Sequence, residues 1–314
     1  MPDLSGLAER LVMLAKEERL SYPADLLRGI AAALLVPRRF VVFYGPPGTG
    51  KSRLVQLVAD ALAAELRLVP VQAGWRDSAD LVGFYDAARE RFVPGELAAV
   101  ALRAAAEPRR SFLLCLEEMT LGDPEGYLAG LLCGLDANPP RLHLGLPAGD
   151  ERGEIPLPEN LFYFGTIYAE PGRRVELPRK FLDRAALFEL EFADLQPFLA
   201  GREVFFPGRE PLLAACETMR SHRIPVGYRV CREIAAAVAG AASVGLSPER
   251  LLDQQMKARL LPLVRGPAED VEDCLRALVR LFSAEEVRYP ETLDKVVRML
   301  EELGLHGYTA AYIG

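Results

Sequence analysis

The fold is decided by one stretch near the N-terminus, Phe40-Val41-Val42-Phe43-Tyr44 followed by Gly45-Pro46-Pro47-Gly48-Thr49-Gly50-Lys51-Ser52. Its first part is a continuous apolar run, which predicts a strand buried on both faces, as in a parallel sheet. Its second part fits the pattern Gly-x-x-x-x-Gly-Lys-Ser/Thr, and the Ala/Leu-rich residues 52–65 predict a helix directly after it. A loop between a buried strand and a helix is the context in which this pattern binds nucleotide phosphates.

Residues 45–52, which we call the phosphate loop, have the chemistry needed to hold a nucleotide. Glycines let backbone N–H groups turn inward toward phosphate oxygens, and the N-terminus of the following helix adds positive potential. We expect Lys51 to reach the β- and γ-phosphates and the Ser52 hydroxyl to ligate Mg²⁺. The alternative is a chance glycine-rich turn, but every position of the pattern is matched in the right context. The predicted nucleotide-binding residues are Gly45, Pro46, Pro47, Gly48, Thr49, Gly50, Lys51, Ser52 and Arg53.

A second motif supplies two adjacent carboxylates. The apolar run 112–116 predicts another strand, and Glu117 and Glu118 follow it directly. Beside a phosphate loop this is the Walker B arrangement, in which the first carboxylate holds the Mg²⁺ shell and the second orients the attacking water. Glu117 is one methylene longer than the usual Asp, which predicts altered metal geometry. We therefore predict Ser52 and Glu117 as metal ligands and Glu117 and Glu118 as catalytic residues. The alternative is two solvated carboxylates at a strand end.

Strand and helix signals alternate over much of the chain. Apolar runs predict strands at 40–44, 66–71, 112–116, 161–167 and 186–192, and helices are expected at 52–65, 95–106 and 124–135. The alternation predicts a three-layer α/β domain over residues 37–193. Residues 140–158, rich in Pro and Gly, are interpreted as a hairpin insertion, and helices at 6–19 and 23–35 form a lead-in over residues 1–36.

The strand signals stop after about residue 193. Helical spacing of apolar residues predicts helices at 209–221, 228–243, 248–261, 268–282 and 290–303. Ser247-Pro248 is a typical helix start, with Ser as the cap and Pro at the first helical position. Residues 194–314 are therefore expected to form a smaller all-helical domain.

The composition excludes several classes of protein. Hydrophobic residues make up 50% of the chain and charged residues 26%, which excludes disorder as the main state. Lys plus Arg is 37 against 44 for Asp plus Glu, and this net charge of −7 disfavours a free-standing DNA-binding protein. Five cysteines without a Cys-x-x-Cys pair argue against structural zinc. The sequence has neither a signal-peptide core nor an 18-residue apolar run, so we expect a cytoplasmic protein.

With these motifs in place, the chain resembles AAA+ ATPases, and more narrowly the McrB-type branch of restriction motors, from about residue 22 to the C-terminus. The resemblance is carried by Val71 to Trp75, Asp80 to Tyr85, Leu116 to Thr120, Leu161 to Thr166, Phe181 to Ala185, Gly227 to Val230, Leu261 to Gly266 and Tyr289-Pro290. It implies an α/β AAA+ domain with a helical lid, assembly with itself into a ring, expected to be a hexamer, and Mg²⁺ with ATP or GTP. It also implies an McrC-like nuclease subunit as partner, with DNA contacted indirectly or through the ring centre; from the lack of an 18-residue apolar run we expect no membrane span.

The resemblance assigns roles to two arginines. Arg184 is expected to act as an arginine finger on a neighbour's nucleotide, because a planar guanidinium can meet developing phosphate charge. The alternative pairs it with Asp183 or another surface acid, and Arg173, Arg174 and Arg179 are rivals for the role. Arg229 is expected to be the sensor-2 residue that contacts the γ-phosphate from the lid; the alternative is a surface arginine at a helix start.

Three residues depart from the family pattern. Glu117 replaces the Walker B Asp, Thr120 replaces an Asn, and Tyr168 replaces the sensor-1 Asn, whose amide a longer phenol does not reproduce. Nucleotide binding is therefore better supported than hydrolysis, and a hydrolysis-poor regulatory subunit is one alternative. A MoxR-like chaperone that remodels a partner protein is another. ATP is the default nucleotide, and the base is expected near residues 20–24, where no motif that reads guanine is found.

Overall fold

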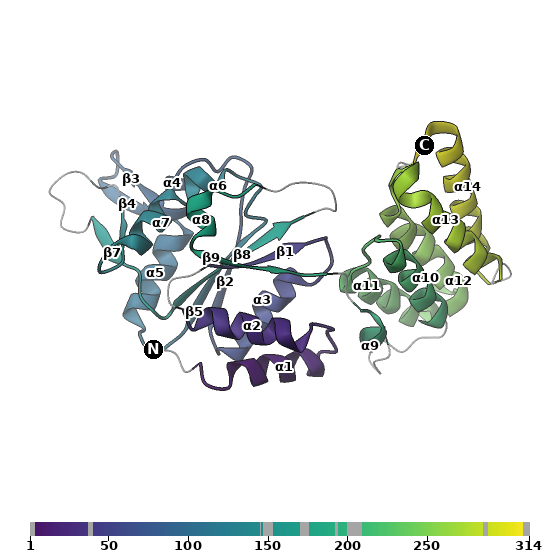
Figure 1. Cartoon of the computed structure of the whole chain (residues 1–314), viewed down its shortest axis with the longest axis horizontal. Coiled ribbons are helices and arrows are strands. Elements are labelled where there is room, and N and C mark those ends of the chain that lie inside the picture. The colour runs from purple at the N-terminus through teal and green to yellow at the C-terminus, as the bar shows by residue number, and fades with distance from the viewer. Residues whose placement is uncertain are drawn as a thin grey trace. The chain divides into compact units, whose positions relative to one another are not determined.

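The computed structural model describes residues 4–36, 40–144, 146, 153–169, 176–191, 194–199, 209–284 and 288–309. By compactness the chain divides into two units (Figure 1). The first comprises residues 1–15, 22–45 and 51–190, and the second comprises residues 16–21, 46–50 and 191–314. The central residues of the phosphate loop thus group with the C-terminal unit, and each unit is described by itself.

A five-stranded parallel sheet forms the centre of the first unit. Its order is β2(Glu65–Pro70), β5(Phe112–Glu117), β8(Leu161–Tyr168), β1(Phe40–Gly45) and β9(Ala185–Glu189). Residues 40–43 are at most 1% exposed, as the continuous apolar run predicted. Because the strands are parallel, β1, β5 and β8 all deliver their last residues to one edge of the sheet.

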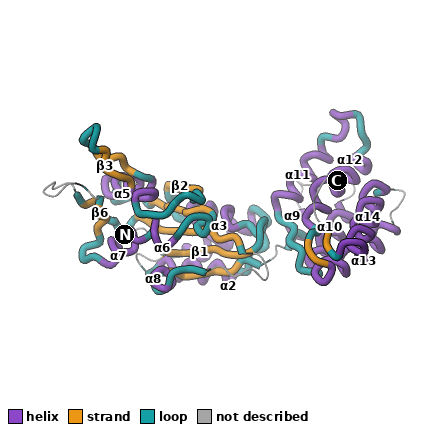
Figure 2. The backbone as a smooth tube through the Cα atoms, turned by 90° about the horizontal axis from the view of Figure 1, so that it is seen from above, coloured by secondary structure: helices purple, strands orange, loops and turns teal. Residues whose placement is uncertain are grey.

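Helices flank this sheet, as Figures 1 and 2 show. They are α1(Leu7–Glu17), α2(Ala24–Leu34), α3(Lys51–Ala61), α4(Ala79–Val82), α5(Glu96–Ala106), α6(Pro124–Tyr127), α7(Ala129–Asp136) and α8(Arg179–Leu182). The predicted α/β architecture with a parallel sheet is confirmed. The predicted helix over 52–65 is too long, because Ala63 adopts a positive φ of 46° and Ala64 donates its N–H back to Ala59, which ends α3 before β2 begins.

Two hairpins extend from the sheet. The expected insertion contains β6(Arg141–His143) paired with β7(Glu154–Pro156), and residues 145 and 147–152 at its tip lie outside the described residues. A second hairpin, β3(Gly83–Asp86) with β4(Arg91–Pro94), was not predicted. The strand expected at 186–192 spans Ala185–Glu189 instead, and the helix expected at 124–135 is divided into α6 and α7 at Leu128.

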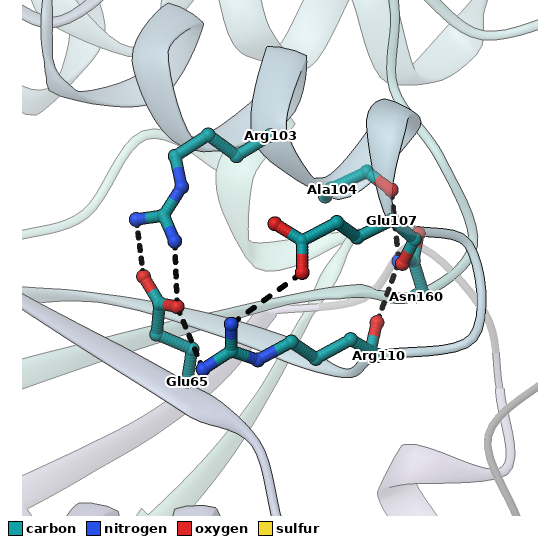
Figure 3. Close-up of polar contacts among 6 residues, drawn as sticks. All are labelled: Glu65, Arg103, Ala104, Glu107, Arg110 and Asn160. Carbon is teal, nitrogen blue, oxygen red and sulfur yellow. Dashed lines mark hydrogen bonds and ion pairs between the residues drawn. The ribbon is translucent and has the colours of Figure 1, made fainter.

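The amino ends of β2, β5 and β8 are joined by a polar cluster, which Figure 3 draws. Glu65, the first residue of β2, forms ion pairs with Arg103 and Arg110, the second at 3.0 Å. The buried side-chain amide of Asn160 donates to the carbonyl oxygens of Ala104, at 3.0 Å, Glu107, at 3.1 Å, and Arg110, at 2.7 Å. Asn160 therefore satisfies carbonyls that α5 and the turn after it leave without intrahelical partners.

The second unit is mainly helical, as predicted. Its helices are α9(Gln196–Leu199), α10(Arg209–Ser221), α11(Tyr228–Ala239), α12(Pro248–Gln255), α13(Ala268–Ser283) and α14(Pro290–His306). The helix expected at 228–243 ends at Ala239, because Gly240 intervenes before the short 3₁₀ segment η2(Ala241–Val244). The helix expected at 248–261 changes into a π-helical turn, η3(Met256–Leu260), and then a 3₁₀ turn, η4(Leu261–Leu263). Pro262 has no N–H to continue an α-helix there.

A short antiparallel pair, β10(Gly266–Pro267) with β11(Tyr308–Thr309), also lies in the second unit and corrects the expectation that no strand follows residue 193. Figure 2 shows this pair in orange among the helices. Across the described residues of both units, no helix combines the length and apolar character needed to cross a bilayer.

Candidate active site

The phosphate loop has a backbone that requires its glycines. Gly45, Gly48 and Gly50 have φ values of 145°, 79° and 92°, which side-chain-bearing residues rarely adopt. At Gly45 a Cβ would also lie 2.3 Å from the carbonyl oxygen of Leu190. The helix α3 begins at Lys51, within the last two residues of this loop, so its N-terminal N–H groups are available to an anion bound there.

The ammonium group of Lys51 is held across the loop. Its Nζ donates to the carbonyl oxygen of Gly45 at 2.8 Å. Burial lowers the pKa of Lys51 from 10.5 to about 8, and the nearby charge of Glu118 acts in the opposite direction. The site therefore holds a cation that is poorly solvated and that gains from a bound polyanion.

The two predicted metal ligands are in direct contact. The Ser52 hydroxyl, at the start of α3, donates to Oε1 of Glu117, at the end of β5, over 2.6 Å. The extra methylene of Glu117 thus does not prevent the pairing. One hydroxyl and one carboxylate fit Mg²⁺, which keeps several waters and is completed by substrate phosphates. Within the described part of the chain, no group of three or more His, Cys, Asp or Glu residues provides a separate metal site.

Glu118 lies in the turn after β5 with its backbone in an unusual conformation. Its φ is 53°, and its N–H is donated to the Oγ1 of Thr166 at 3.0 Å. The next residue, Met119, donates its N–H to the carbonyl of Thr166 at 2.9 Å and accepts a 2.7 Å hydrogen bond from the hydroxyl of Tyr127. Sequence reasoning missed Thr166 and Tyr127. A polar residue within the otherwise apolar strand 161–168 was the available signal for Thr166.

The two other departures from the family pattern lie beside this site. Tyr168, the last residue of β8, pairs in register with Gly45, and Ala169 donates its N–H to the Gly45 carbonyl at 3.1 Å. The position expected to be sensor 1 is therefore adjacent to the phosphate loop, and it carries a phenol where the resemblance implies an amide. Thr120 is half-buried in the turn that contains Glu118. Arg53, predicted to contact nucleotide, donates to Gln56 on the same helix at 2.7 Å.

Arg184 is not brought together with the phosphate loop. Its carbonyl accepts a 2.9 Å hydrogen bond from the N–H of Phe40, so it lies at the amino end of β1, whereas the loop follows the carboxyl end. Its side chain is ion-paired with Asp136 and donates to the Lys180 carbonyl, and the hydrogen bond to Asp136 raises the pKa of Arg184. The surface-acid alternative is thus realised with Asp136. Of the rivals, Arg179 begins α8, and Arg173 and Arg174 lie outside the described residues.

Arg229 is exposed and is the second residue of α11. Within the same compact unit, Gly227 packs so closely on Gly48 that a Cβ on Gly48 would lie 2.6 Å from the Gly227 Cα. Tyr228 accepts a 2.8 Å hydrogen bond from the N–H of Ser21, in the segment expected to meet the base. The start of α11 therefore lies beside Gly48 of the phosphate loop and beside Ser21, both of which belong to its own unit.

Two family models match the chain. Residues 40–135 match the AAA domain (dynein-related subfamily), and residues 209–308 match a domain of unknown function, DUF8727. No curated protein matches it. The first match runs from β1 into α7 and includes the phosphate loop, Glu117 and Glu118. It supports an AAA+ ATPase domain, whose general activity is the binding and hydrolysis of nucleoside triphosphates.

Proposed function

We propose that this chain is an AAA+ nucleoside triphosphatase that depends on Mg²⁺ and works as the motor subunit of a ring. The observation that carries the proposal is the 2.6 Å hydrogen bond between Ser52 and Glu117. It places the end of one strand against the start of the helix that follows the phosphate loop, and Lys51 and Glu118 lie close enough for their charges to interact. A solvated surface pair would not need this convergence.

The residues divide the reaction among them. Backbone N–H groups of the loop and the Lys51 ammonium would bind the phosphates, and Ser52 and Glu117 would hold Mg²⁺, which when bound would supply neutralisation of phosphate charge. The Glu118 carboxylate orients a water molecule and takes its proton as the water oxygen bonds to the γ-phosphorus. The bond from that phosphorus to the β,γ-bridging oxygen breaks, which releases nucleoside diphosphate and phosphate. Arg229 would contact the γ-phosphate from the helical unit.

A ring is favoured by the placement of Arg184. The strand β1 has six residues, and at about 3.3 Å per residue it separates Arg184 from the loop by about 17–20 Å. An arginine side chain does not span that distance, so Arg184 serves catalysis only if it reaches the nucleotide of a neighbouring copy. To do so, Arg184 would have to break its ion pair with Asp136 and contact the phosphate instead.

The finer assignment is that of an McrB-like motor in a DNA restriction or defence system. It is supported by the sequence segments that resemble that branch and by the hairpin β6–β7, which would face the ring centre or a partner. The expected partner is an McrC-like nuclease subunit, with DNA contacted indirectly or through the ring centre. A MoxR-like chaperone is the alternative within the same enzyme class. Co-purification of tagged chain from its native host distinguishes them: a nuclease favours the first and a remodelled metalloenzyme favours the second.

A second candidate function, a nucleotide-binding regulatory subunit that hydrolyses poorly, is favoured by Tyr168 beside Gly45. An amide at this position both bonds the γ-phosphate and positions water, which a phenol does not. If this candidate is correct, Tyr168→Asn should raise kcat by about 10-fold, in keeping with the roughly 1 kcal/mol that one hydrogen bond contributes. The affinity for nucleotide should change little.

The first experiment measures Mg²⁺-dependent phosphate release from ATP and from GTP, beside direct binding of each nucleotide. Wild type, Lys51→Ala and Glu118→Gln are compared. The proposal expects Lys51→Ala to lose binding and Glu118→Gln to bind normally while losing phosphate release. Unchanged binding in Lys51→Ala would refute the assignment of the phosphate loop. Tight binding by wild type without release would favour the regulatory subunit.

A further inference from the structure

The turn after β5 is held by hydrogen bonds that the reaction chemistry does not itself require. We propose that Thr166 and Tyr127 are positioning residues, which fix the backbone of Glu118 and Met119 and thereby aim the Glu118 carboxylate. The inference rests on the proposed function, because it concerns the residue that would orient the attacking water.

The backbone of Glu118 does not adopt its conformation by preference. A φ of 53° lies in the left-handed region, which is uncommon for residues other than glycine. Such conformations persist where the surrounding structure over-determines them, and they cluster at active sites. The direction of the Glu118 side chain depends on this φ, so whatever maintains the conformation also aims the carboxylate.

Thr166 supplies two of the constraints. Its Oγ1 accepts the Glu118 N–H at 3.0 Å, and its carbonyl accepts the Met119 N–H at 2.9 Å. Thr166 is only 3% exposed, so no bulk water is available to replace its hydroxyl. Without that hydroxyl the Glu118 N–H would lose this acceptor, and the turn would be free to relax toward an ordinary φ.

Tyr127 supplies the third constraint from α6. Its hydroxyl donates to the Met119 carbonyl at 2.7 Å, and burial raises the pKa of this phenol, so it remains a donor over the working pH range. The ring is completely buried and packs edge-on against Trp75, with 5.5 Å between ring centroids. Met119 fits closely over β8, because a Cβ on Gly165 would lie 2.5 Å from its sulfur.

The same strand connects this turn to the phosphate loop. Two residues after Thr166, Tyr168 pairs with Gly45, so β8 contacts both the loop and the turn. Because Thr166 contacts the turn and a different residue, Tyr168, pairs with the loop, a change confined to the Thr166 hydroxyl should disturb the aim of Glu118 without disturbing the glycines that bind phosphate. This separation of kcat from binding distinguishes a positioning role from a structural one.

The test compares Thr166→Val, which keeps the shape and removes the hydroxyl, with Thr166→Ser, which keeps the hydroxyl. We expect Thr166→Val to lower kcat for phosphate release by about 100-fold, the loss that a misplacement of about 1 Å produces, with less than about a twofold change in the Kd for Mg-nucleotide. Thr166→Ser should retain most of the wild-type kcat. Tyr127→Phe should lower kcat in the same direction by about 10-fold, because one of the constraints is lost.

The matched control is Ser78→Ala. Ser78 also accepts a backbone N–H through its hydroxyl, from Gly130 at 2.8 Å, in the same unit. It should leave kcat unchanged. In the Glu118→Gln background, Thr166→Val should have no further effect on the residual rate. An equal loss of kcat in Ser78→Ala, or an unchanged kcat in Thr166→Val, would overturn the inference while the proposed function stood.

Hydrogen–deuterium exchange of residues 117–121 gives a readout that does not need turnover. We expect faster exchange in this segment in Thr166→Val and wild-type protection in Thr166→Ser. If the wild-type chain bound Mg-nucleotide and released no phosphate, the hydrolytic function would be wrong. Unchanged protection of the segment in Thr166→Val would then overturn the positioning role as well.

Discussion

Lys51 shows how a single residue in the phosphate loop is prepared for its ligand. The group loses solvation, and its pKa falls to about 8. Bound phosphates would favour its charged form and raise the pKa again. At pH 8 the free protein is therefore about half protonated at Lys51, and binding should take up about half a proton per nucleotide.

Calorimetry in two buffers of different ionisation enthalpy measures this uptake. The affinity for nucleotide should fall as pH rises above 8, because the free protein must first gain a proton. The free energy of unfolding has the opposite pH dependence. The Lys51 ammonium keeps its proton up to about pH 10.5 in the unfolded chain, whereas it releases the proton near pH 8 in the folded chain. The nucleotide-free fold should therefore gain stability between these two values. Lys51→Ala, which is expected not to bind nucleotide, is the control for stability: it should show no such gain, and a gain that survived this substitution would assign the proton elsewhere.

Substitution of Glu117 tests whether the longer carboxylate at the Walker B position impairs the proposed Mg²⁺ site or is accommodated by it. The Ser52 hydroxyl meets its Oε1 at 2.6 Å, so the site is built around the extra methylene. Glu117→Asp restores the commoner residue but withdraws the carboxylate from Ser52. We expect Mg²⁺-dependent nucleotide binding to weaken by about 10-fold, in keeping with the loss of one charge-assisted hydrogen bond.

The measurement is a Mg²⁺ titration of nucleotide binding for wild type, Glu117→Asp and Glu117→Gln. Tighter Mg²⁺ coupling in Glu117→Asp than in wild type would contradict the fitted-site interpretation. It would favour a hydrolysis-poor subunit in which Glu117 is part of the loss.

At the scale of elements, the residues at the amino ends of the strands stabilise the fold, whereas those at the carboxyl ends form the candidate site. Asn160 donates to three carbonyl oxygens around the end of α5, and it is buried. Asn160→Ala leaves those acceptors with little water to replace the amide, so we expect a loss of about 2–3 kcal/mol in the free energy of unfolding. Urea denaturation measures it.

The control for Asn160 is Glu65→Gln, in the same cluster (Figure 3). The Arg103 and Arg110 side chains that pair with Glu65 are about half exposed, so this substitution should cost no more than about 1 kcal/mol. A larger loss in Glu65→Gln than in Asn160→Ala would show that the ion pairs, rather than the amide, hold this edge.

How well elements could be predicted depended on whether their signals were local. The strand predicted at 40–44 and the helix predicted at 209–221 follow from apolar runs and spacing alone, and the structure confirms them as Phe40–Gly45 and Arg209–Ser221. The hairpin β3–β4 was missed because its turn, Ala87-Ala88-Arg89-Glu90, has no Gly, Pro or Asn; the Asp86 carboxylate instead accepts the N–H groups of Ala88 and Arg89. The site divides in the same way: the phosphate loop, Glu117 and Glu118 could be predicted from motif spacing, whereas Thr166 and Tyr127 depend on long-range contacts.

At the scale of the molecule, one copy of the chain does not assemble the complete set of predicted catalytic residues. Arg184 and the phosphate loop lie at opposite ends of β1. Removal of an arginine finger costs about 10³-fold or more in kcat. We therefore expect Arg184→Ala to bind nucleotide normally and to lose almost all turnover, as Glu118→Gln should. Each variant lacks a different group of the same proposed site: Glu118→Gln lacks the carboxylate, and Arg184→Ala lacks the guanidinium.

Mixing the two inactive variants tests whether the site is shared between copies. In a head-to-tail ring, a productive interface pairs the intact Glu118 of an Arg184→Ala subunit with the intact Arg184 of a Glu118→Gln neighbour. Random mixing at equal ratio makes about a quarter of the interfaces productive, so activity should return to about a quarter of wild type. Asp136→Ala, which frees Arg184 from its ion pair, should retain turnover and so exclude a merely structural role for that pair. A mixture that assembles but releases no phosphate would contradict action in trans. Glu118 from one variant and Arg184 from the other would then be present in the same ring without forming an active site.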